Sequence, residues 1–363
     1  MPLNLSNKAI VASAGSGKTE ELVVRALSVP PVQRVLLTTF TDNGANEIRA
    51  RFIKKAGILP ANIEVIPWLT FLLRHGIRPY QNPTLGVNVV GGLHFDPRPG
   101  RPKKTDVHRY YLDPSGNVYR EFLAELAVLL NEQSGGAVID RISGIFDHLY
   151  FDEIQDISAR DFEFLELLMG STTTVTVSGD PRQGTFSTTQ SRTNRALTKS
   201  NIVRWIDALE AKGMIEKEVH RHSLRCNQSI CDFSDALYPD LEQTQSRNSK
   251  FTDHDGIFLV KSADVPLYAG RHSPQLLVWD KNSETYGLRG RNMGDVKGLT
   301  YDRVLINPTT TMIKHLTSGA ELKDGTRAKF YVGITRARHS VAIVLDKPGN
   351  SEIPYWNPPS IDP

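Results

Sequence analysis

The sequence of 363 residues is poor in cysteine and holds just two, Cys226 and Cys231. Two thiols cannot build a disulfide framework or a four-ligand metal site, so we expect two small, half-buried apolar side chains in a reducing compartment. No apolar run approaches the roughly 20 residues of a membrane span, and the sequence does not open with the basic and then apolar pattern of a signal peptide. We therefore expect a cytoplasmic protein without a membrane partner.

An excess of charge of one sign is also absent. The chain has 43 Lys and Arg against 40 Asp and Glu, a net charge of +3. This balance permits a nucleic-acid partner without requiring one. A hydrophobic share of 39% and a charged share of 23% are typical of a globular protein and exclude a disordered or fibrous chain. The length is sufficient for two domains, each with its own core.

The segment 12–19 reads Ala-Ser-Ala-Gly-Ser-Gly-Lys-Thr, between a predicted strand at 9–12 and a predicted helix at 20–27. Small residues at such a junction let backbone N–H groups surround phosphate oxygens at a helix N-terminus. Ala12 stands at the first glycine position of this pattern, so a plain strand-to-helix turn is the alternative. We predict that Lys18 reaches the β- and γ-phosphates and that Thr19 ligates Mg²⁺. The predicted nucleotide-binding residues are Ala14, Gly15, Ser16, Gly17, Lys18 and Thr19.

Two further polar segments follow apolar runs. The first run ends in Asp152 and Glu153, where Asp152 would hold Mg²⁺ through its water shell and Glu153 would polarise the attacking water. Paired acids are usually solvated strand ends, but the phosphate loop upstream favours the functional interpretation. After the strand predicted at 172–180, Gln183 is placed to hydrogen-bond the γ-phosphate or the catalytic water. That contact would couple the nucleotide state to the loop that carries Phe186.

A strand predicted at 34–41 ends in Thr39, Phe40 and Thr41, and a helix predicted at 45–55 follows. A strand and a helix after the phosphate loop indicate a parallel, doubly wound sheet. Such sheets bind ligands at the carboxyl edge of their strands. These three residues are therefore candidate contacts for a nucleic acid, and a simple capped strand end is an equally good interpretation.

The stretch 76–109 is rich in Pro, Gly, Arg and Lys and is followed by Tyr110, Tyr111 and Tyr119. Its composition indicates an insertion into the first domain that is partly loop. A basic segment flanked by aromatic residues can lie along a phosphate backbone, and it can equally be a solvated loop. Both interpretations remain open at this stage.

Taken in order along the chain, these segments resemble the motifs of the UvrD/Rep/PcrA-like helicases of superfamily 1. In that family the motifs read AGSGKT, TFTN-x-A-A, DE-x-QD and GD-x-x-Q-x-x-Y/F, and similar sequences occur here at 14–19, 39–42, 152–156 and 179–186. The second half resembles the motif with a Tyr-Arg-Ser core, the S-x-KG-L-E-F motif and the YV-x-x-TRA motif at 222–229, 294–301 and 331–338. The resemblance runs from residue 9 to about residue 345.

The resemblance implies an α/β fold with two RecA-like P-loop domains, each a mostly parallel sheet flanked by helices, and a small insertion in the first. The expected parts are a first domain at 1–200 with an inserted subdomain at about 76–135, a second domain at 201–346, and a Pro-rich tail at 347–363. Trp356 in the tail is either an anchor for a partner or part of a strap that packs on the body.

The resemblance also implies roles for residues of the second half. Arg225 would contact phosphate, and Arg336 would be the arginine finger. ATP would bind between the domains, so that hydrolysis requires their closure. The implied catalytic set is Lys18, Glu153, Gln183, Arg225 and Arg336. The implied contacts with nucleic acid are Thr39, Phe40, Thr41, Phe186 and Lys297.

The function implied by the resemblance is an ATP- and Mg²⁺-dependent translocase or helicase on single-stranded DNA that travels 3′ to 5′, with RNA left open as a substrate. The alternative is a nucleotide-gated DNA-binding or sensor ATPase that does not unwind, as the partner of a nuclease in anti-phage defence. The short segment between Arg225 and Lys297, where the family inserts a large accessory domain, favours the alternative. A small-molecule P-loop kinase would leave Gln183 and Arg225 unexplained.

Several departures from the family concern the base of the nucleotide. The family's adenine-reading glutamine before the phosphate loop is missing, and Leu224 stands where the family has an adenine-stacking tyrosine. Gly294 and Thr300 replace a histidine and a glutamate of the S-x-KG-L-E-F motif. We therefore hypothesise a relaxed nucleotide specificity.

Overall fold

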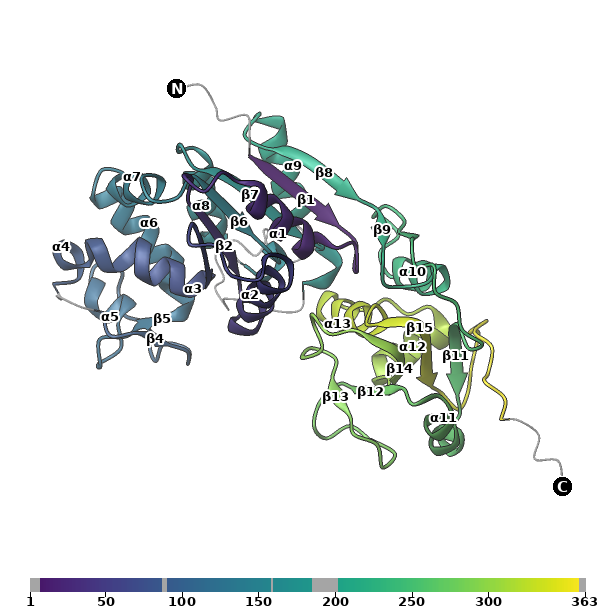
Figure 1. Ribbon diagram of the computed structural model, residues 1–363. Helices are drawn as coiled ribbons and strands as arrows, with labels where there is room; N and C mark the ends of the chain where they lie inside the picture. Colours follow the sequence, from purple (N-terminus) through teal and green to yellow (C-terminus); the bar gives the residue numbers. More distant parts are fainter. Residues whose placement is uncertain (1–6, 87–89, 158, 185–201, 359–363) are drawn as a thin grey trace. The chain divides into compact units, whose positions relative to one another are not determined.

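The computed structural model describes residues 7–86, 90–157, 159–184 and 202–358 (Figure 1). The chain divides into two compact units. Unit 1 comprises 1–11, 18–181 and 186–219, and unit 2 comprises 12–17, 182–185 and 220–363. Unit 1 thus continues past residue 200, where the sequence placed the boundary, and the phosphate loop 12–17 clusters with unit 2. The predicted α/β class of mostly parallel sheets flanked by helices is confirmed.

Unit 1 is built on a six-stranded sheet in the order β3-β2-β6-β7-β1-β8. Neighbouring strands from β3 to β1 pair in parallel. All five residues of β2 are buried, as expected for an inner strand covered on both faces. The carboxyl ends of β1, β2, β6 and β7 therefore lie along one edge. The strands are β1 (Lys8–Ala12), β2 (Val35–Thr39), β3 (Ile63–Pro67), β6 (His148–Phe151), β7 (Thr174–Gly179) and β8 (Glu216–His220).

The helices of unit 1 have clear local causes. Helix α2 starts where the Thr41 hydroxyl accepts a hydrogen bond from the Gly44 N–H, and it ends at Gly57 in the left-handed region. The fully buried Trp68 fixes α3 by donating its indole N–H to Asp161 at 2.7 Å. The main helices are α1 (Lys18–Ser28), α2 (Asp42–Ala56), α3 (Trp68–Phe71) with its π-helical continuation η1 (Leu72–Ile77), α8 (Ala159–Met169) and α9 (Ile202–Ala211).

The segment of the predicted insertion lies within unit 1, and its elements gather at one end of that unit (Figure 1). Strands β4 and β5 form a small parallel sheet of their own. Tyr111, Leu112 and Val118 are buried, so the segment contributes its own apolar side chains to the core. The elements are η2 (Arg78–Tyr80), α4 (Gln81–Leu85), β4 (Leu93–His94), α5 (Val107–Tyr111), β5 (Val118–Tyr119), η3 (Arg120–Phe122), α6 (Leu123–Gln133) and α7 (Ala137–Ser143).

Unit 2 is built on a five-stranded parallel sheet in the order β11-β15-β14-β12-β13. The strands β9 (His222–Ser223) and β10 (Gln245–Ser246) form a separate parallel pair, which no third strand joins within the described part of the chain. The sheet strands are β11 (Gly256–Val260), β12 (Gln275–Val278), β13 (Arg291–Asn292), β14 (Tyr301–Ile306) and β15 (Ala337–Val344). The helices are α10 (Gln228–Asp235), η8 (Ser262–Asp264), α11 (Val265–His272), α12 (Thr310–Ser318) and α13 (Asp324–Ile334).

The segment that contains Trp356 packs on unit 2. The Trp356 N–H donates to the Leu259 carbonyl at 2.8 Å, and its ring lies 5.1 Å from the Tyr268 ring. The side chain is 9% exposed. Of the two interpretations of this residue, the structure therefore supports the strap. None of the helices in the described part of the chain combines the length and the apolar character that a bilayer crossing requires.

Candidate nucleotide-binding site

The phosphate loop has the backbone that its glycines predict. Gly15 and Gly17 have φ angles of 76° and 90°, in the left-handed region that side chains rarely adopt. A Cβ on Gly15 would lie 2.7 Å from the Cβ of Arg225, and the Leu224 N–H donates to the Gly15 carbonyl at 2.9 Å. Among the described residues, the buried Ser16 hydroxyl has no hydrogen-bond partner. A phosphate oxygen would supply that partner.

Lys18, the first residue of α1, is paired with Glu153. Its Nζ lies 2.9 Å from Oε1 of Glu153, and the lysine side chain is buried. Burial opposes the lysine charge, but the carboxylates of Glu153, Asp152 and Asp180 outweigh it and raise the pKa of Lys18. A permanently charged ammonium at the start of a helix suits the binding of phosphate.

Asp152 lies among hydroxyl groups at the end of β6. The Thr19 hydroxyl donates to its Oδ2 at 2.5 Å, and the Ser178 hydroxyl donates to its Oδ1 at 2.8 Å. Burial and the neighbouring Glu153 raise the pKa of Asp152, against the opposite effect of Lys18. Carboxylate and hydroxyl oxygens are ligands that suit Mg²⁺, and a bound cation would stabilise the buried carboxylate. The predicted pair Thr19 and Asp152 therefore fits a magnesium site.

Glu153 is held in an unusual conformation by its neighbours. Its φ angle is 62°, which is rare for a residue with a side chain. Gln155 donates a hydrogen bond to the Glu153 carboxylate and accepts one from the Asp180 N–H at 3.1 Å. A Cβ on Gly179 would lie 2.4 Å from Oε1 of Gln155. The ends of β6 and β7 are thus locked together around the proposed general base.

In unit 2 the structure brings Gln183 and Arg336 together. The guanidinium of Arg336 donates to the Gln183 side-chain oxygen at 3.4 Å and to the Val332 carbonyl at 3.0 Å. Arg336 is 1% exposed. The second predicted arginine, Arg225, donates to the carbonyl of Thr335 at 3.0 Å. Both predicted arginines are therefore fixed around the start of β15.

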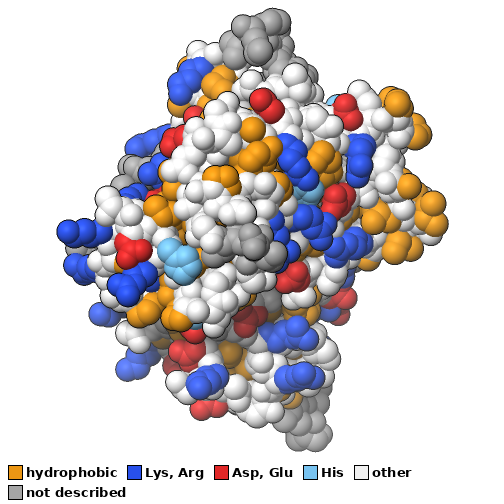
Figure 2. Space-filling view, turned by 90° about the vertical axis from the view of Figure 1, so that its left-hand side faces the viewer, with side chains coloured by type: hydrophobic (Ala, Val, Ile, Leu, Met, Phe, Trp, Pro, Cys, Tyr) orange, Lys and Arg blue, Asp and Glu red, His pale blue; other side chains and the backbone are white. Residues whose placement is uncertain are grey.

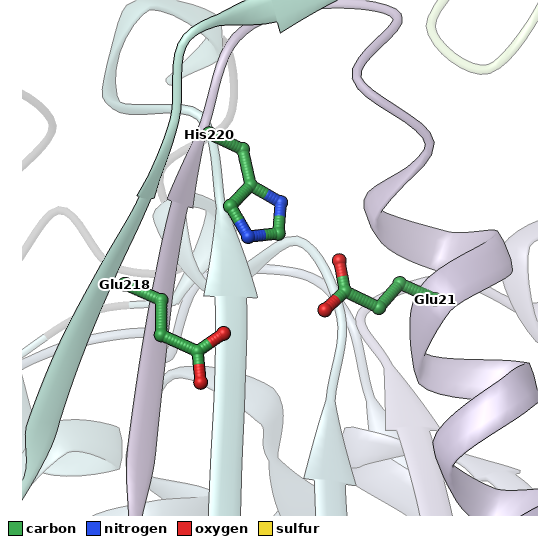
Figure 3. A group of neighbouring side chains, drawn as sticks. All are labelled: Glu21, Glu218 and His220. Carbon is green, nitrogen blue, oxygen red and sulfur yellow. The ribbon is translucent and has the colours of Figure 1, made fainter.

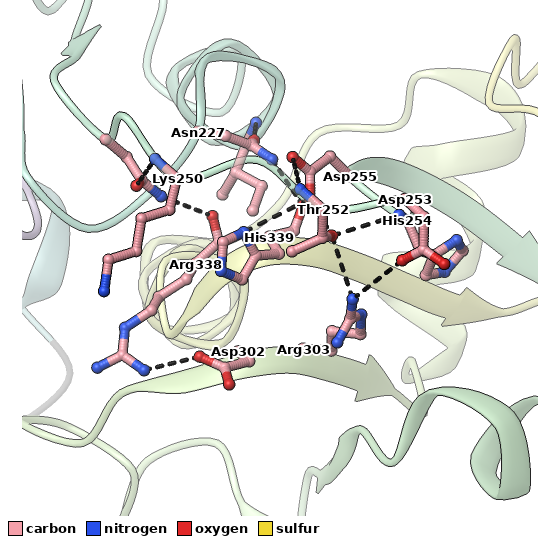
Figure 4. Close-up of polar contacts among 12 residues, drawn as sticks. Asn227, Lys250, Thr252, Asp253, His254, Asp255, Asp302, Arg303, Arg338 and His339 are labelled. Atoms are coloured by element: carbon pink, nitrogen blue, oxygen red, sulfur yellow. Dashed lines mark hydrogen bonds and ion pairs between the residues drawn. The ribbon is translucent and has the colours of Figure 1, made fainter.

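The chain around Arg336 is anchored by polar contacts (Figure 4). Asn227 caps α10 and donates from its side chain to the His339 carbonyl at 2.6 Å. Arg338 donates to Asp302 at 2.7 Å. These bonds tie β15 to β14 and to the helix that follows Arg225.

Three residues of this site escape prediction from the sequence. Ser178 and Gln155 support the two acidic residues, as described above. Arg182 donates to the Ser13 hydroxyl at 3.4 Å and lies 3.6 Å from the Asp235 carboxylate. Gln155 lies inside the DE-x-QD segment, and Arg182 directly precedes Gln183. Closeness to predicted site residues is therefore the only sequence feature that could have indicated Gln155 and Arg182.

The structure describes four of the five predicted contacts with nucleic acid. Thr39 is buried, Phe40 is 9% exposed, and the exposed Thr41 is the cap of α2. Lys297 belongs to unit 2 and is half-buried. Phe186 lies outside the described residues. The role of these residues stays a prediction.

A second group of titratable side chains lies between α1 and β8. Figure 3 shows Glu21 on α1 together with Glu218 and His220 of β8. Arg25 donates to Glu21 and to Glu218, each at 2.6 Å, and Lys8 donates to Glu218 at 2.6 Å. Since the two carboxylates already hold cationic side chains, this group serves to attach β8 to α1.

Comparisons with known proteins gave a match to one family model and several similar solved structures. Residues 3–77 match the family model described as the UvrD/REP helicase N-terminal domain. No curated protein matches the chain. Similar solved structures include the arterivirus nonstructural protein 10 (helicase), at 15% identity with a TM-score of 0.46, and its complex with DNA, at 15% and 0.47. The PRRSV helicase is similar at 16% identity with a TM-score of 0.45.

These three structural matches cover more of this chain than of the viral chains. Each covers 94% of this chain, but 60%, 61% and 53% of the respective viral chains. The chain thus spans less than two thirds of the length of these helicases.

Proposed function

We propose that this chain, whose residues 3–77 match the family model of the UvrD/REP helicase N-terminal domain, is an ATP-dependent translocase or helicase. Its proposed track is single-stranded DNA, along which it travels 3′ to 5′. The observation that carries the proposal is the set of paired groups at the edge of the unit 1 sheet, Lys18 with Glu153 and Thr19 with Asp152.

In the proposed mechanism the nucleotide phosphates lie in the loop of residues 14–17, at the N-terminus of α1. Lys18 exchanges its contact with Glu153 for one with the β- and γ-phosphates. The Glu153 carboxylate is then left to accept a proton from the attacking water. Thr19 and Asp152 would hold Mg²⁺, which supplies positive charge to the phosphate oxygens.

Gln183 would orient the water or the γ-phosphate, and Arg225 and Arg336 would stabilise the charge that develops during transfer. Arginines in this role raise the rate of other nucleotidases by about 10³–10⁵. We propose that hydrolysis and product release alternately close and open the two units, which would move the strand. Thr39, Phe40, Thr41, Phe186 and Lys297 would contact that strand.

We also propose a relaxed nucleotide specificity. Leu224 is 56% exposed, and its Cδ1 would lie 3.5 Å from a Cβ on Gly17. An aliphatic side chain beside the phosphate loop offers a base no hydrogen bond and no aromatic face. Comparable hydrolysis of ATP and GTP would support this proposal, and strict dependence on ATP would remove it.

A second candidate function is a nucleotide-gated DNA-binding or sensor ATPase that does not unwind, as a partner of a nuclease in defence against phage. The observation that favours it is that residues 236–300, all of which the structure describes, form part of unit 2. They build β10 to β13 and α11 of unit 2 itself, so that no separate accessory domain stands there.

One set of assays tests both candidates. Nucleotide hydrolysis is measured with and without single-stranded DNA and RNA, and unwinding is measured on duplexes with a 3′ or a 5′ tail. The helicase predicts hydrolysis stimulated by DNA and separation of the 3′-tailed duplex. Stimulated hydrolysis without separation would favour the second candidate, and no hydrolysis in any condition would contradict both.

A further inference from the structure

Phe95, in the inserted subdomain, is a large aromatic side chain that the fold leaves in solvent. It follows β4 directly and is 66% exposed. The guanidinium carbon of Arg120 lies 6.0 Å from the centre of its ring. A ring exposed to this degree adds little to the core and has a face available to a ligand.

Arg120 links this ring to the edge of the main sheet. The same guanidinium lies 5.3 Å from the ring of Phe40, the residue that follows β2. Its Nε is buried and has no acceptor among the described residues. Phe40 itself is covered, so of the two rings beside Arg120 the one open to a ligand is Phe95.

The surroundings of Phe95 are basic. Residues 95–109 hold five Lys and Arg against two Asp, an excess equal to the net charge of the whole chain. Arg101 and Lys103 are exposed. Figure 2 faces the side of unit 1 that carries the insertion, and Lys and Arg side chains are interspersed there with hydrophobic ones.

The segment that carries these charges is held in place by aromatic residues. The guanidinium of Arg98 lies 4.3 Å from the ring centre of Tyr110 and 4.4 Å from that of Phe122. Lys104 donates to Glu125 of α6 at 2.5 Å. The contacts of Arg98 and Lys104 therefore hold the basic segment against the rest of the insertion, close in sequence to Phe95.

We propose that Phe95, backed by Arg120, is a stacking platform for a base of single-stranded DNA. The inference rests on the proposed function, because it adds a contact for the same strand. A ring among cations suits a nucleic acid, which offers a flat base to the ring and phosphates to the cations. An apolar protein partner would need neighbouring apolar side chains, and here the neighbours of Phe95 in sequence are His94, Asp96, Pro97 and Arg98.

The experiment uses the full chain and a fluorescein-labelled oligothymidylate, with binding followed by fluorescence anisotropy. Phe95→Ala removes the ring and should weaken binding about 5- to 160-fold, the usual range for loss of one stacked base. Phe95→Tyr keeps the ring and should bind as the wild type does. The control is Val32→Ala, because Val32 is also exposed but lies before β2, at the opposite edge of the sheet from Phe40.

A second readout separates binding from hydrolysis. For Phe95→Ala the DNA concentration that gives half-maximal stimulation of ATP hydrolysis should rise by the same factor, while hydrolysis without DNA stays unchanged. If the wild type binds the oligonucleotide and Phe95→Ala binds it equally well, the platform is refuted and the proposed function stands. If the wild type neither binds the oligonucleotide nor responds to it, the proposed function fails and the platform with it.

Discussion

Lys18 and Glu153 form an ion pair, with 2.9 Å between Nζ and Oε1. The residue proposed to bind phosphate and the residue proposed to activate water are thus in direct contact. Both side chains are largely shielded from water, so each lowers the cost of burying the other. Phosphate binding would break this pair, which makes the site responsive to the nucleotide.

Glu153→Gln tests the proposed general base. The amide keeps the size of the side chain but cannot accept a proton, so hydrolysis should fall by about 10²–10⁴ while nucleotide binding persists. Binding is measured with a fluorescent nucleotide and hydrolysis by phosphate release. Lys18→Ala is the matched variant and should lose binding itself. A Glu153→Gln protein that hydrolyses at the wild-type rate would exclude the assigned role.

Arg336→Ala tests the proposed arginine finger. Hydrolysis should be abolished, and nucleotide binding should remain largely intact, because the charge is needed mainly when the phosphate is transferred. The buried guanidinium also binds the carbonyl of Val332, so its removal should lower the free energy of unfolding by roughly 1–3 kcal/mol. Arg336→Lys keeps a positive charge, and melting curves for both variants separate stability from catalysis. Substantial residual turnover would count against the assignment.

Gly179→Ala tests the support of Glu153. The new Cβ would lie 2.4 Å from Oε1 of Gln155 and should displace this side chain, which holds both Glu153 and the Asp180 N–H. We expect a loss of hydrolysis of about tenfold or more, since misplacement of catalytic groups by about 1 Å can cost about 10²-fold. Gly170→Ala is the control, because its nearest neighbour would lie 3.5 Å away. Equal activities of the two variants would show that Gln155 does not position Glu153.

The buried side chain of His75 should make the folded protein less stable in acid. Burial, together with the charges of Arg141, Arg74 and Arg34, lowers the pKa of His75 to about 4. The unfolded chain then takes up a proton near the ordinary pKa of 6.5, before the folded chain does. The free energy of unfolding should be level above pH 6.5 and fall between pH 6.5 and 4.

The measurement is urea unfolding across this pH range for the wild type and for His75→Leu. Between pH 6.5 and 4, the free energy of unfolding of the wild type should change more steeply with pH than that of the variant. The difference should be up to about 1.4 kcal/mol per pH unit, the value for one proton. A residual slope is expected from His254 of unit 2, whose pKa burial also lowers to about 4. Identical slopes for the two proteins would mean that His75 is accessible to protons in the folded chain.

Much of the fold could be predicted from the sequence because the signals are local. Apolar runs that end in a polar pair, such as the run before Asp152, are typical of parallel strands, and the strand is present as β6. In unit 2, strands β11, β12, β14 and β15 likewise coincide with apolar runs of the sequence. Strand β8 could not be predicted in this way, since Glu216, Lys217 and Glu218 lack an apolar pattern. It is fixed by long-range ion pairs to Lys8 and Arg25.

The supporting contacts of the site were likewise hidden from the sequence. The left-handed conformation of Glu153 and its bond from Gln155 depend on how β6 and β7 end side by side, which no local pattern encodes. The exposure of Phe95 could not be predicted from a local sequence pattern either. Arg120 covers Phe40 and leaves Phe95 open, and this follows from the packing of the insertion on unit 1.

The most direct test of the account is the rate of ATP hydrolysis with and without single-stranded DNA, for the wild type and Lys18→Ala. We predict Mg²⁺-dependent hydrolysis that single-stranded DNA stimulates and that Lys18→Ala abolishes. Hydrolysis that persists in Lys18→Ala, or that does not respond to DNA, would contradict the account.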